Sequence, residues 1–152
     1  MNIRPIIKSD ILGLKSVLDN CELFPADYLD EMIVDYLENP NTDHLWFTVA
    51  EEGKVLSIAY CAPMKFTNGT YNLYAIGVHN DYQGKGIGKK MMVYLEKELK
   101  SAGHRILIVE TSSTDNLALT REFYNRCGYR KEASIHNFWD DGDDKVVFWK
   151  KL

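Results

Sequence analysis

The sequence predicts a mixed α/β domain, in which about seven strands form a mostly antiparallel sheet around one central parallel pair, with four helices. Three observations favour this fold class. The turn signals Glu52-Gly53 and Asn68-Gly69 separate three β-type runs and indicate a meander, because both tolerate positive φ. A long amphipathic stretch then separates two apolar runs, which a right-handed crossover makes parallel. The third is the length of 152 residues, which suits a single domain over residues 1–152.

The first half of the chain is expected to contain a short strand, two helices and the meander. Ser9 or Asp10 can cap the first helix. Pro25 suits the first turn of the second helix, which Asn39-Pro40-Asn41 ends. The expected ranges are 2–7 (strand), 10–20 (first helix), and 45–50, 55–61 and 71–78 (meander strands).

The second half is expected to contain two helices and three strands. Apolar residues keep helical spacing over 86–102, and Gly103 is a good helix stop. The run Ile-Leu-Ile-Val within 105–110 is typical of a strand buried on both faces. Thr114 or Asp115 can cap a helix that reaches Arg126. The expected closing antiparallel strands are 129–138 and 145–151.

Composition excludes several classes of protein. The net charge is −4 with no basic stripe, which makes nucleic acid a poor candidate partner. No apolar run reaches the ~18 residues that a membrane span needs, and the first residues lack the form of a signal peptide. The three cysteines are an odd number without metal-ligand spacing, so we expect free thiols, no metal and a cytoplasmic location.

The segment Gln-Gly-Lys-Gly-Ile-Gly at 83–88 is the most informative motif in the chain. Three glycines let the backbone approach a ligand, and the helix that begins there directs free N–H groups at the same place. This combination predicts an anion site, with phosphate as the expected anion. The P-loop and dinucleotide patterns both fail, because their glycine spacings do not match Gly84, Gly86 and Gly88.

The pattern Gln83-x-x-Gly86-x-Gly88 resembles the pyrophosphate loop of the GNAT family of N-acetyltransferases, which bind acetyl-CoA. The strand at 73–82 is also similar to the family's strand before this loop. Thr120-Arg121-Glu122-Phe123-Tyr124, followed by Cys127-Gly128-Tyr129, resembles a second family signature. The resemblance covers about residues 44–152 and implies a GNAT-like fold, in which the central parallel strands splay apart.

The resemblance implies how acetyl-CoA would be held. The pantetheine arm would bond to strand backbone in the cleft between the splayed strands, at Ile76 and Val78. In the family, an Asn that contacts pantetheine often lies seven residues before the Tyr. This chain has Leu117 at that position. Asn116, one residue earlier, either makes this contact or helps to cap its helix. Lys85 and Lys89 either add charge to the phosphates or are ordinary solvated residues. The loop residues expected to contact the diphosphate are Gln83, Gly84, Lys85, Gly86, Ile87, Gly88 and Lys89.

The resemblance also implies catalytic roles. Tyr124 would donate a proton to the leaving thiolate, although it equally fits the apolar face of its helix. The family often has a Glu early in the strand before the loop, but this chain has Asn72, which cannot take a proton. Glu110 is therefore the first candidate for the base, His79 the second and a chain of waters the third.

The expected function is transfer of acetyl from acetyl-CoA to a primary amine by direct attack in a ternary complex. The acceptor is a small-molecule amine or a peptide, and the enzyme forms either a monomer or a homodimer. Alternatives are a catalytically silent acyl-CoA-binding module, favoured by Asn72, or another acyl-CoA donor. The acidic turn 140–144 either draws a substrate ammonium or is simply solvated. Tyr60, Trp139 and Trp149 either line an acceptor pocket or fill the core.

Overall fold

The computed structural model describes residues 1–152, and their contacts fall into two compact units. The first unit combines Met1–Pro63 with Tyr74–Leu95, and the second combines Met64–Leu73 with Glu96–Leu152. The strand β5 (Thr70–Val78) therefore begins in the second unit and ends in the first. A single domain over residues 1–152 remains a prediction.

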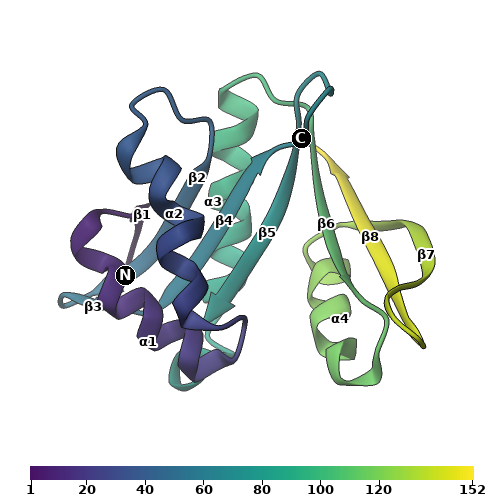
Figure 1. The fold of residues 1–152 in the computed structure, drawn as a ribbon, viewed down its shortest axis with the longest axis horizontal. Coiled ribbons are helices and arrows are strands. Elements are labelled where there is room, and N and C mark those ends of the chain that lie inside the picture. Colours follow the sequence, from purple (N-terminus) through teal and green to yellow (C-terminus); the bar gives the residue numbers. More distant parts are fainter. The chain divides into compact units, whose positions relative to one another are not determined.

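The strands are hydrogen-bonded in the order β1-β2-β4-β5-β6-β8-β7, with the short β3 on β2 (Figure 1). β5 and β6 are parallel, in register from Thr70 opposite Ile106 to Leu73 opposite Val109. The predicted fold class is confirmed, and β3 makes eight strands in place of about seven. The remaining strands are β1 (Asn2–Pro5), β2 (Leu45–Glu51), β3 (Lys54–Val55), β4 (Ser57–Pro63), β6 (Ile106–Ser112), β7 (Arg130–Asp140) and β8 (Asp143–Lys151).

Four α-helices are present, as predicted, together with four short 3₁₀ turns. The helix expected from Thr114 or Asp115 starts later, because a 3₁₀ turn over Asp115–Leu117 precedes it. The predicted stop at Gly103 is confirmed: its φ is +87°, and His104 N donates to Leu99 O. The helices are α1 (Ile11–Cys21), α2 (Leu29–Glu38), α3 (Ile87–Ser101) and α4 (Ala118–Arg126), and the other 3₁₀ turns are Lys8–Asp10, Ala26–Tyr28 and Asn80–Tyr82.

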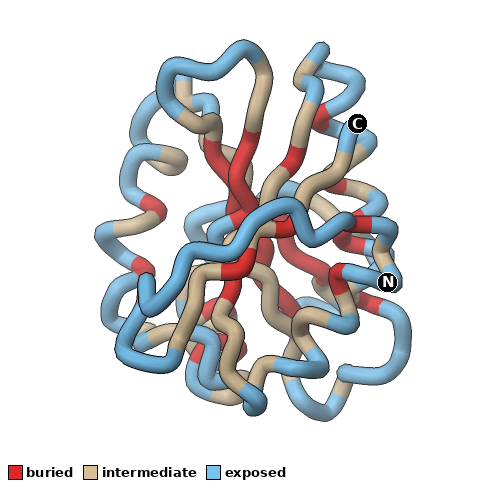
Figure 2. Tube along the Cα trace, turned by 90° about the vertical axis from the view of Figure 1, so that its right-hand side faces the viewer, coloured by how far each residue is buried: buried red, intermediate tan, exposed pale blue.

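The first unit has helices on both faces of its strands (Figure 1). Trp46 is fully buried in a core that includes Leu14 of α1 and Ile33 of α2. Its neighbour Phe47 points the other way, since side chains alternate along a strand, and its ring lies 5.1 Å from that of Tyr94 in α3. Buried positions accordingly gather in the strands, while turns are exposed (Figure 2).

The second unit packs α4 on one face of the β6–β8 ladder. The Tyr124 ring lies 5.5 Å from Phe148 and 6.1 Å from Tyr129. Glu96 accepts hydrogen bonds from the Tyr129 hydroxyl and from Lys150 Nζ, each at 2.8 Å. These contacts join the second half of α3 to Tyr129, directly before β7, and to β8.

The two predicted turns differ in outcome. Glu52 and Gly53 have φ of +49° and +77° and form the two-residue hairpin loop that the sequence predicts. The prediction of positive φ at Asn68 was wrong, because the turn takes positive φ at Phe66 and Gly69 instead. The physical reason is that Arg105 uses the carbonyls of both Asn68 and Gly69, at 2.6 and 2.8 Å.

Candidate active site

The loop at residues 83–88 leads into α3 in the first unit. Gly84 and Gly86 have φ of +73° and +80°, and a Cβ at either would meet no atom within 4 Å. Glycine is therefore needed for backbone conformation, while the space beside it stays open. Lys90 N donates to Gly86 O at 3.0 Å, so α-helical bonding begins there and the earlier N–H groups lack helical acceptors. This geometry suits an anion.

The side chains of Gln83 and Ile87 hold the loop in position. The Gln83 side-chain amide donates to Val78 O at 2.9 Å and to Asn80 Oδ1 at 3.0 Å. Ile87 is 1% exposed and anchors the first turn of α3. Both residues were predicted to contact acetyl-CoA. In the structure, their side chains hold the loop in place.

Two lysines meet on the ring of Tyr82, directly before the loop. Lys85 Nζ lies 4.9 Å from the ring centroid and Lys54 Nζ lies 5.1 Å from it. Lys54 comes from β3, about thirty residues earlier, and no sequence signal connected it with the loop. Lys89 is exposed on the first turn of α3.

The end of β5 carries the predicted backbone contacts Ile76 and Val78, both partly exposed. Between them, a Cβ at Gly77 would lie 3.0 Å from Cys21 Sγ and 3.1 Å from Leu23 Cδ2. The end of α1 thus requires glycine here. The Val78 carbonyl already accepts from Gln83, although a carbonyl oxygen can accept a second bond.

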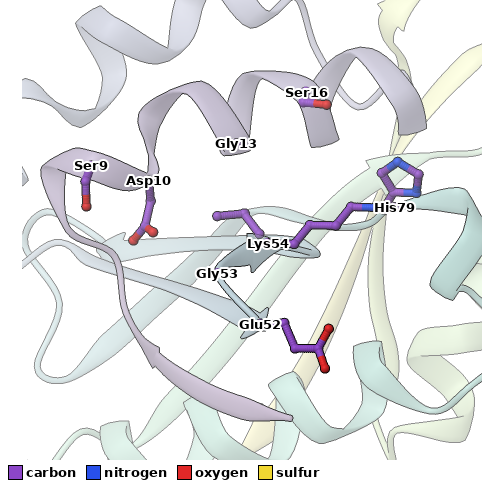
Figure 3. A pocket seen from close by; sticks show the side chains of 9 residues that line it. Ser9, Asp10, Gly13, Ser16, Glu52, Gly53, Lys54 and His79 are labelled. Atoms are coloured by element: carbon purple, nitrogen blue, oxygen red, sulfur yellow. The ribbon is translucent and has the colours of Figure 1, made fainter.

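His79, the second candidate base, lines a pocket of about 370 Å³ in the first unit (Figure 3). In Figure 3, Lys54 extends towards its ring, and Ser16 lies on the helix above. His79 Nδ1 accepts from Asp81 N at 3.3 Å, which places the neutral ring's proton on Nε2. Asp81 Oδ2 lies 3.8 Å from the same nitrogen.

Tyr124, the candidate acid, is 5% exposed on the inner face of α4. Burial raises the pKa of its phenol, and Cys127 raises it further. The group therefore keeps its proton at neutral pH, which a general acid requires. The ring contacts with Phe148 and Tyr129 also give Tyr124 the packing role that the sequence left open.

Glu110 lies on the opposite face of the ladder from Tyr124. Directly opposed residues of a strand pair share a face; Val109 opposes Phe148, which contacts Tyr124, whereas Glu110 opposes Val147. Glu110 Oε1 lies 2.9 Å from Lys145 Nζ, with both side chains largely buried. Protonating Glu110 would break this ion pair. The pairing of Glu110 with Lys145 could not be predicted from the sequence, because cross-strand partners depend on register.

Asn72, which stands where relatives often have a base, is 3% exposed, and its Oδ1 has no hydrogen-bond partner. It opposes Ile108 in β6, so it shares the face of Glu110. Asn116 is exposed in the 3₁₀ turn before α4 and accepts a hydrogen bond from Thr114 Oγ1. The bond joins two side chains, and neither the 3₁₀ turn nor α4 has a side-chain cap hydrogen bond, so the structure does not show the capping role that the sequence offered as an alternative for Asn116.

The acidic residues of the hairpin between β7 and β8 accept hydrogen bonds from neighbouring groups of the second unit. Asp143 accepts from Ser112 Oγ, and Asp144 accepts from Asn137 N at 2.9 Å. Trp139 is 47% exposed, and its indole N–H donates to Thr111 O at 3.2 Å. Trp139 therefore lies at the surface of the second unit, whereas Phe148 of the same hairpin is buried in its core.

The structure contains no cluster of three or more His, Cys, Asp or Glu side chains placed to hold a metal ion. None of its helices is long and apolar enough to cross a membrane.

Comparison with known proteins agrees with the fold. The model of the acetyltransferase (GNAT) family matches residues 16–129, and the chain belongs to this family. By class, it is therefore an acetyl-CoA-dependent N-acetyltransferase. An N-acetyltransferase of Methanocaldococcus jannaschii whose activity is uncharacterised is 27% identical over 99% of this chain and 92% of its own length.

Two solved structures show the same fold. A protein from Desulfovibrio desulfuricans assigned to the GNAT family has a TM-score of 0.92 and 27% identity, covering 99% of this chain and 98% of that one. An aminoglycoside 6′-N-acetyltransferase in complex with coenzyme A has a TM-score of 0.77 and 17% identity, covering 99% and 97%. The second likeness supports the fold alone.

Proposed function

We propose that the loop over residues 83–88 binds the diphosphate of acetyl-CoA. The single observation that carries this proposal is the pair of positive-φ glycines, Gly84 and Gly86, in open space at the start of a 15-residue helix. Free N–H groups and the positive end of the helix dipole favour a doubly charged ligand there. Lys54 and Lys85, held on Tyr82, add positive charge beside the loop.

The pantetheine arm then follows the backbone of β5 at Ile76 and Val78, as an added strand would. A backbone N–H in this stretch polarises the thioester carbonyl and stabilises the oxyanion that forms on attack. Asn116 borders the arm in this proposal, provided that it leaves its bond to Thr114.

The chemical step is a direct transfer in a ternary complex. The free amine attacks the thioester carbon, a C–N bond forms, and the C–S bond breaks as the tetrahedral intermediate collapses. Tyr124 gives its proton to the leaving thiolate, so that CoA departs as the thiol. Glu110 takes the amine's proton and releases it to solvent, and solvent returns a proton to the phenol. Burial raises the pKa of Tyr124, so the phenol still carries its proton when the thiolate leaves.

Glu110 is the proposed acceptor of the amine's proton. Asn72 shares its face of the ladder and has a free acceptor oxygen, which suits orienting an N–H or a water. The acid and the base then lie on opposite faces of the second unit's strands.

The acceptor is a primary amine on a small molecule or a peptide. The three free cysteines support a reducing, cytoplasmic setting. A panel of amines with acetyl-CoA, followed by thiol release, tests the activity. Titration of Gly86→Glu with CoA tests the loop, with Gly142→Glu as control, because Gly142 has the same φ of +80° and equally open surroundings in the hairpin between β7 and β8. A loss of affinity for Gly86→Glu below about threefold, or ~0.65 kcal/mol, would contradict the loop assignment.

A further inference from the structure

Two hydrogen bonds join the last turn of α1 to the chain directly before the loop at residues 83–88. The backbone N–H of Asn80 donates to Asn20 Oδ1 at 2.6 Å, and the side-chain amide of Asn80 donates to Asn20 O at 2.8 Å. The two residues are 60 positions apart in the chain. The second bond satisfies one of the carbonyl groups that the end of a helix leaves without a helical partner.

Asn80 in turn holds Gln83, the first residue of the loop. Gln83 Nε2 carries two hydrogens, and its two partners, Asn80 Oδ1 at 3.0 Å and Val78 O at 2.9 Å, are both acceptors. The backbone N–H of Gln83 also donates, to Asn80 O at 3.2 Å. Every N–H group of Gln83 is therefore already bonded within the protein, so Gln83 supports the loop and has no donor left for a phosphate.

Backbone groups fix the orientation of both asparagine amides. A backbone N–H only donates, so the Asn20 atom that faces Asn80 N is the side-chain oxygen. A backbone carbonyl only accepts, so the Asn80 atom that faces Asn20 O is the side-chain nitrogen. The side-chain oxygen of Asn80 is then left for Gln83. The side chain at position 80 must donate on one side and accept on the other, which a carboxylate or a methyl group cannot do.

The loop depends on these bonds because packing does not hold its glycines. A Cβ at Gly84 or Gly86 would meet no atom within 4 Å. The end of α1, by contrast, packs closely on β5, since a Cβ at Gly77 would lie 3.0 Å from Cys21 Sγ and 3.1 Å from Leu23 Cδ2. The end of α1 is therefore a firm support, and Asn80 connects the open loop to it.

We propose that Asn80, held by Asn20, is a positioning residue for the donor, because through Gln83 it orients the loop N–H groups that take the diphosphate. The inference rests on the proposed function, in which the loop over residues 83–88 binds the diphosphate of acetyl-CoA. Asn80 acts on the loop and not on the reacting atoms. Its loss should therefore weaken donor binding and leave the chemical step as it is.

Titration of Asn80→Ala with CoA tests this inference. The variant loses the bonds to Asn20 O and Gln83, and Kd should rise about tenfold, the change that two ordinary hydrogen bonds give together. KM for acetyl-CoA should rise with it while kcat stays the same. Asn39→Ala is the matched control, because it removes side-chain bonds to Asn41 N and Asp35 at the end of α2 in the same unit. An unchanged Kd for Asn80→Ala, or an equal rise in the control, would overturn the inference.

A double-mutant cycle shows whether Asn80 acts through Gln83. Gln83→Ala should raise Kd by itself, and adding Asn80→Ala should raise it less than about twofold further, because the link is already broken. Losses that multiply would overturn the inference. Asn20→Ala removes only the acceptor of Asn80 N and should raise Kd about threefold. It tests the same link if Asn80→Ala does not fold, and an unchanged Kd would then overturn the inference.

A donor without the diphosphate, S-acetylpantetheine, separates this inference from the proposed function. Asn80→Ala should lower kcat/KM about tenfold with acetyl-CoA and less than twofold with S-acetylpantetheine. Equal losses with both donors would give Asn80 a general structural role and overturn the inference. If the wild-type protein used both donors equally well, the loop would not bind the diphosphate, and the proposed function itself would be contradicted.

Discussion

The loop of the first unit and the catalytic candidates of the second carry their roles in different ways. In the loop, function resides in the backbone: Gly84 and Gly86 adopt positive φ, and their surroundings are open. In the second unit, function resides in side chains whose behaviour depends on neighbours, such as Lys145 beside Glu110. Backbone-borne function can be read from residue types in order along the chain, whereas side-chain-borne function requires knowing which strands lie opposite one another.

The largest expected effect in the second unit is that of Tyr124→Phe. Turnover should fall by roughly 10²-fold or more, because the ring remains but the transferable proton is lost. CoA affinity and thermal stability should hardly change, and circular dichroism with titration checks both. Because the pKa of Tyr124 is raised, the wild-type rate should show no loss from Tyr124 ionisation up to about pH 10, the ordinary phenol value. Unchanged turnover in a folded variant would show that Tyr124 only packs in the core and donates no proton.

Glu110→Gln should lower the rate by up to about 10²-fold near neutral pH, the lower end of the range for general bases. The loss should shrink at high pH, where the amine is already deprotonated in solution. Lys145→Met is the companion variant: it removes the ion pair but keeps the Glu110 carboxylate, so it separates loss of the pair from loss of the base. A loss that does not depend on pH would give Glu110 a positioning role only.

The ion pair of Arg4 with Asp10 in the first unit is expected to stabilise the fold and to have no part in catalysis, in contrast to the pair of Glu110 with Lys145. Asp10 is 6% exposed and accepts from Arg4 at 2.7 and 2.9 Å. Asp10→Asn should cost about 1.5–3 kcal/mol of unfolding free energy at neutral pH without changing kcat.

The pH dependence of that cost has a definite sign. The hydrogen bonds from Arg4 hold the pKa of Asp10 below its usual range, although burial opposes the shift. Its contribution to stability is therefore present above the unfolded value of about 3.9 and is lost as the pH falls through the lower folded value. Denaturant unfolding of wild type and Asp10→Asn from pH 7 to pH 2 measures this, and a gap that widens on acidification would contradict it.

Asn72→Leu should produce the smallest effect, in opposite directions for stability and rate. A buried acceptor without a partner is destabilising, so its removal should add about 1 kcal/mol and raise the melting temperature by roughly 2–4 °C. If Asn72 orients the amine or a water, kcat should fall at the same time. A more stable variant with full activity would show that Asn72 has no part in the reaction.

These contrasts also show how far the sequence could lead. The strand order around a parallel pair, the stop at Gly103 and the turn at Glu52-Gly53 follow from local residue chemistry and were predicted. The turn at Asn68-Gly69 was predicted too, but not its backbone conformation, in which Arg105 bonds to the carbonyls of Asn68 and Gly69 from far along the chain. The contact of Lys54 with the Tyr82 ring and the stacking of Trp46 on Tyr60 likewise depend on strand pairing, which local patterns do not specify.

The central claim is that the glycine loop recognises the diphosphate of the donor. The most direct measurement compares kcat/KM for acetyl-CoA with that for S-acetylpantetheine, which lacks the diphosphate, in wild type and in Gly86→Glu. The account predicts a loss of about 30-fold or more with acetyl-CoA, roughly 2 kcal/mol, and no loss with the truncated donor. Equal losses with both donors, or none with either, would show that the diphosphate is not bound by this loop.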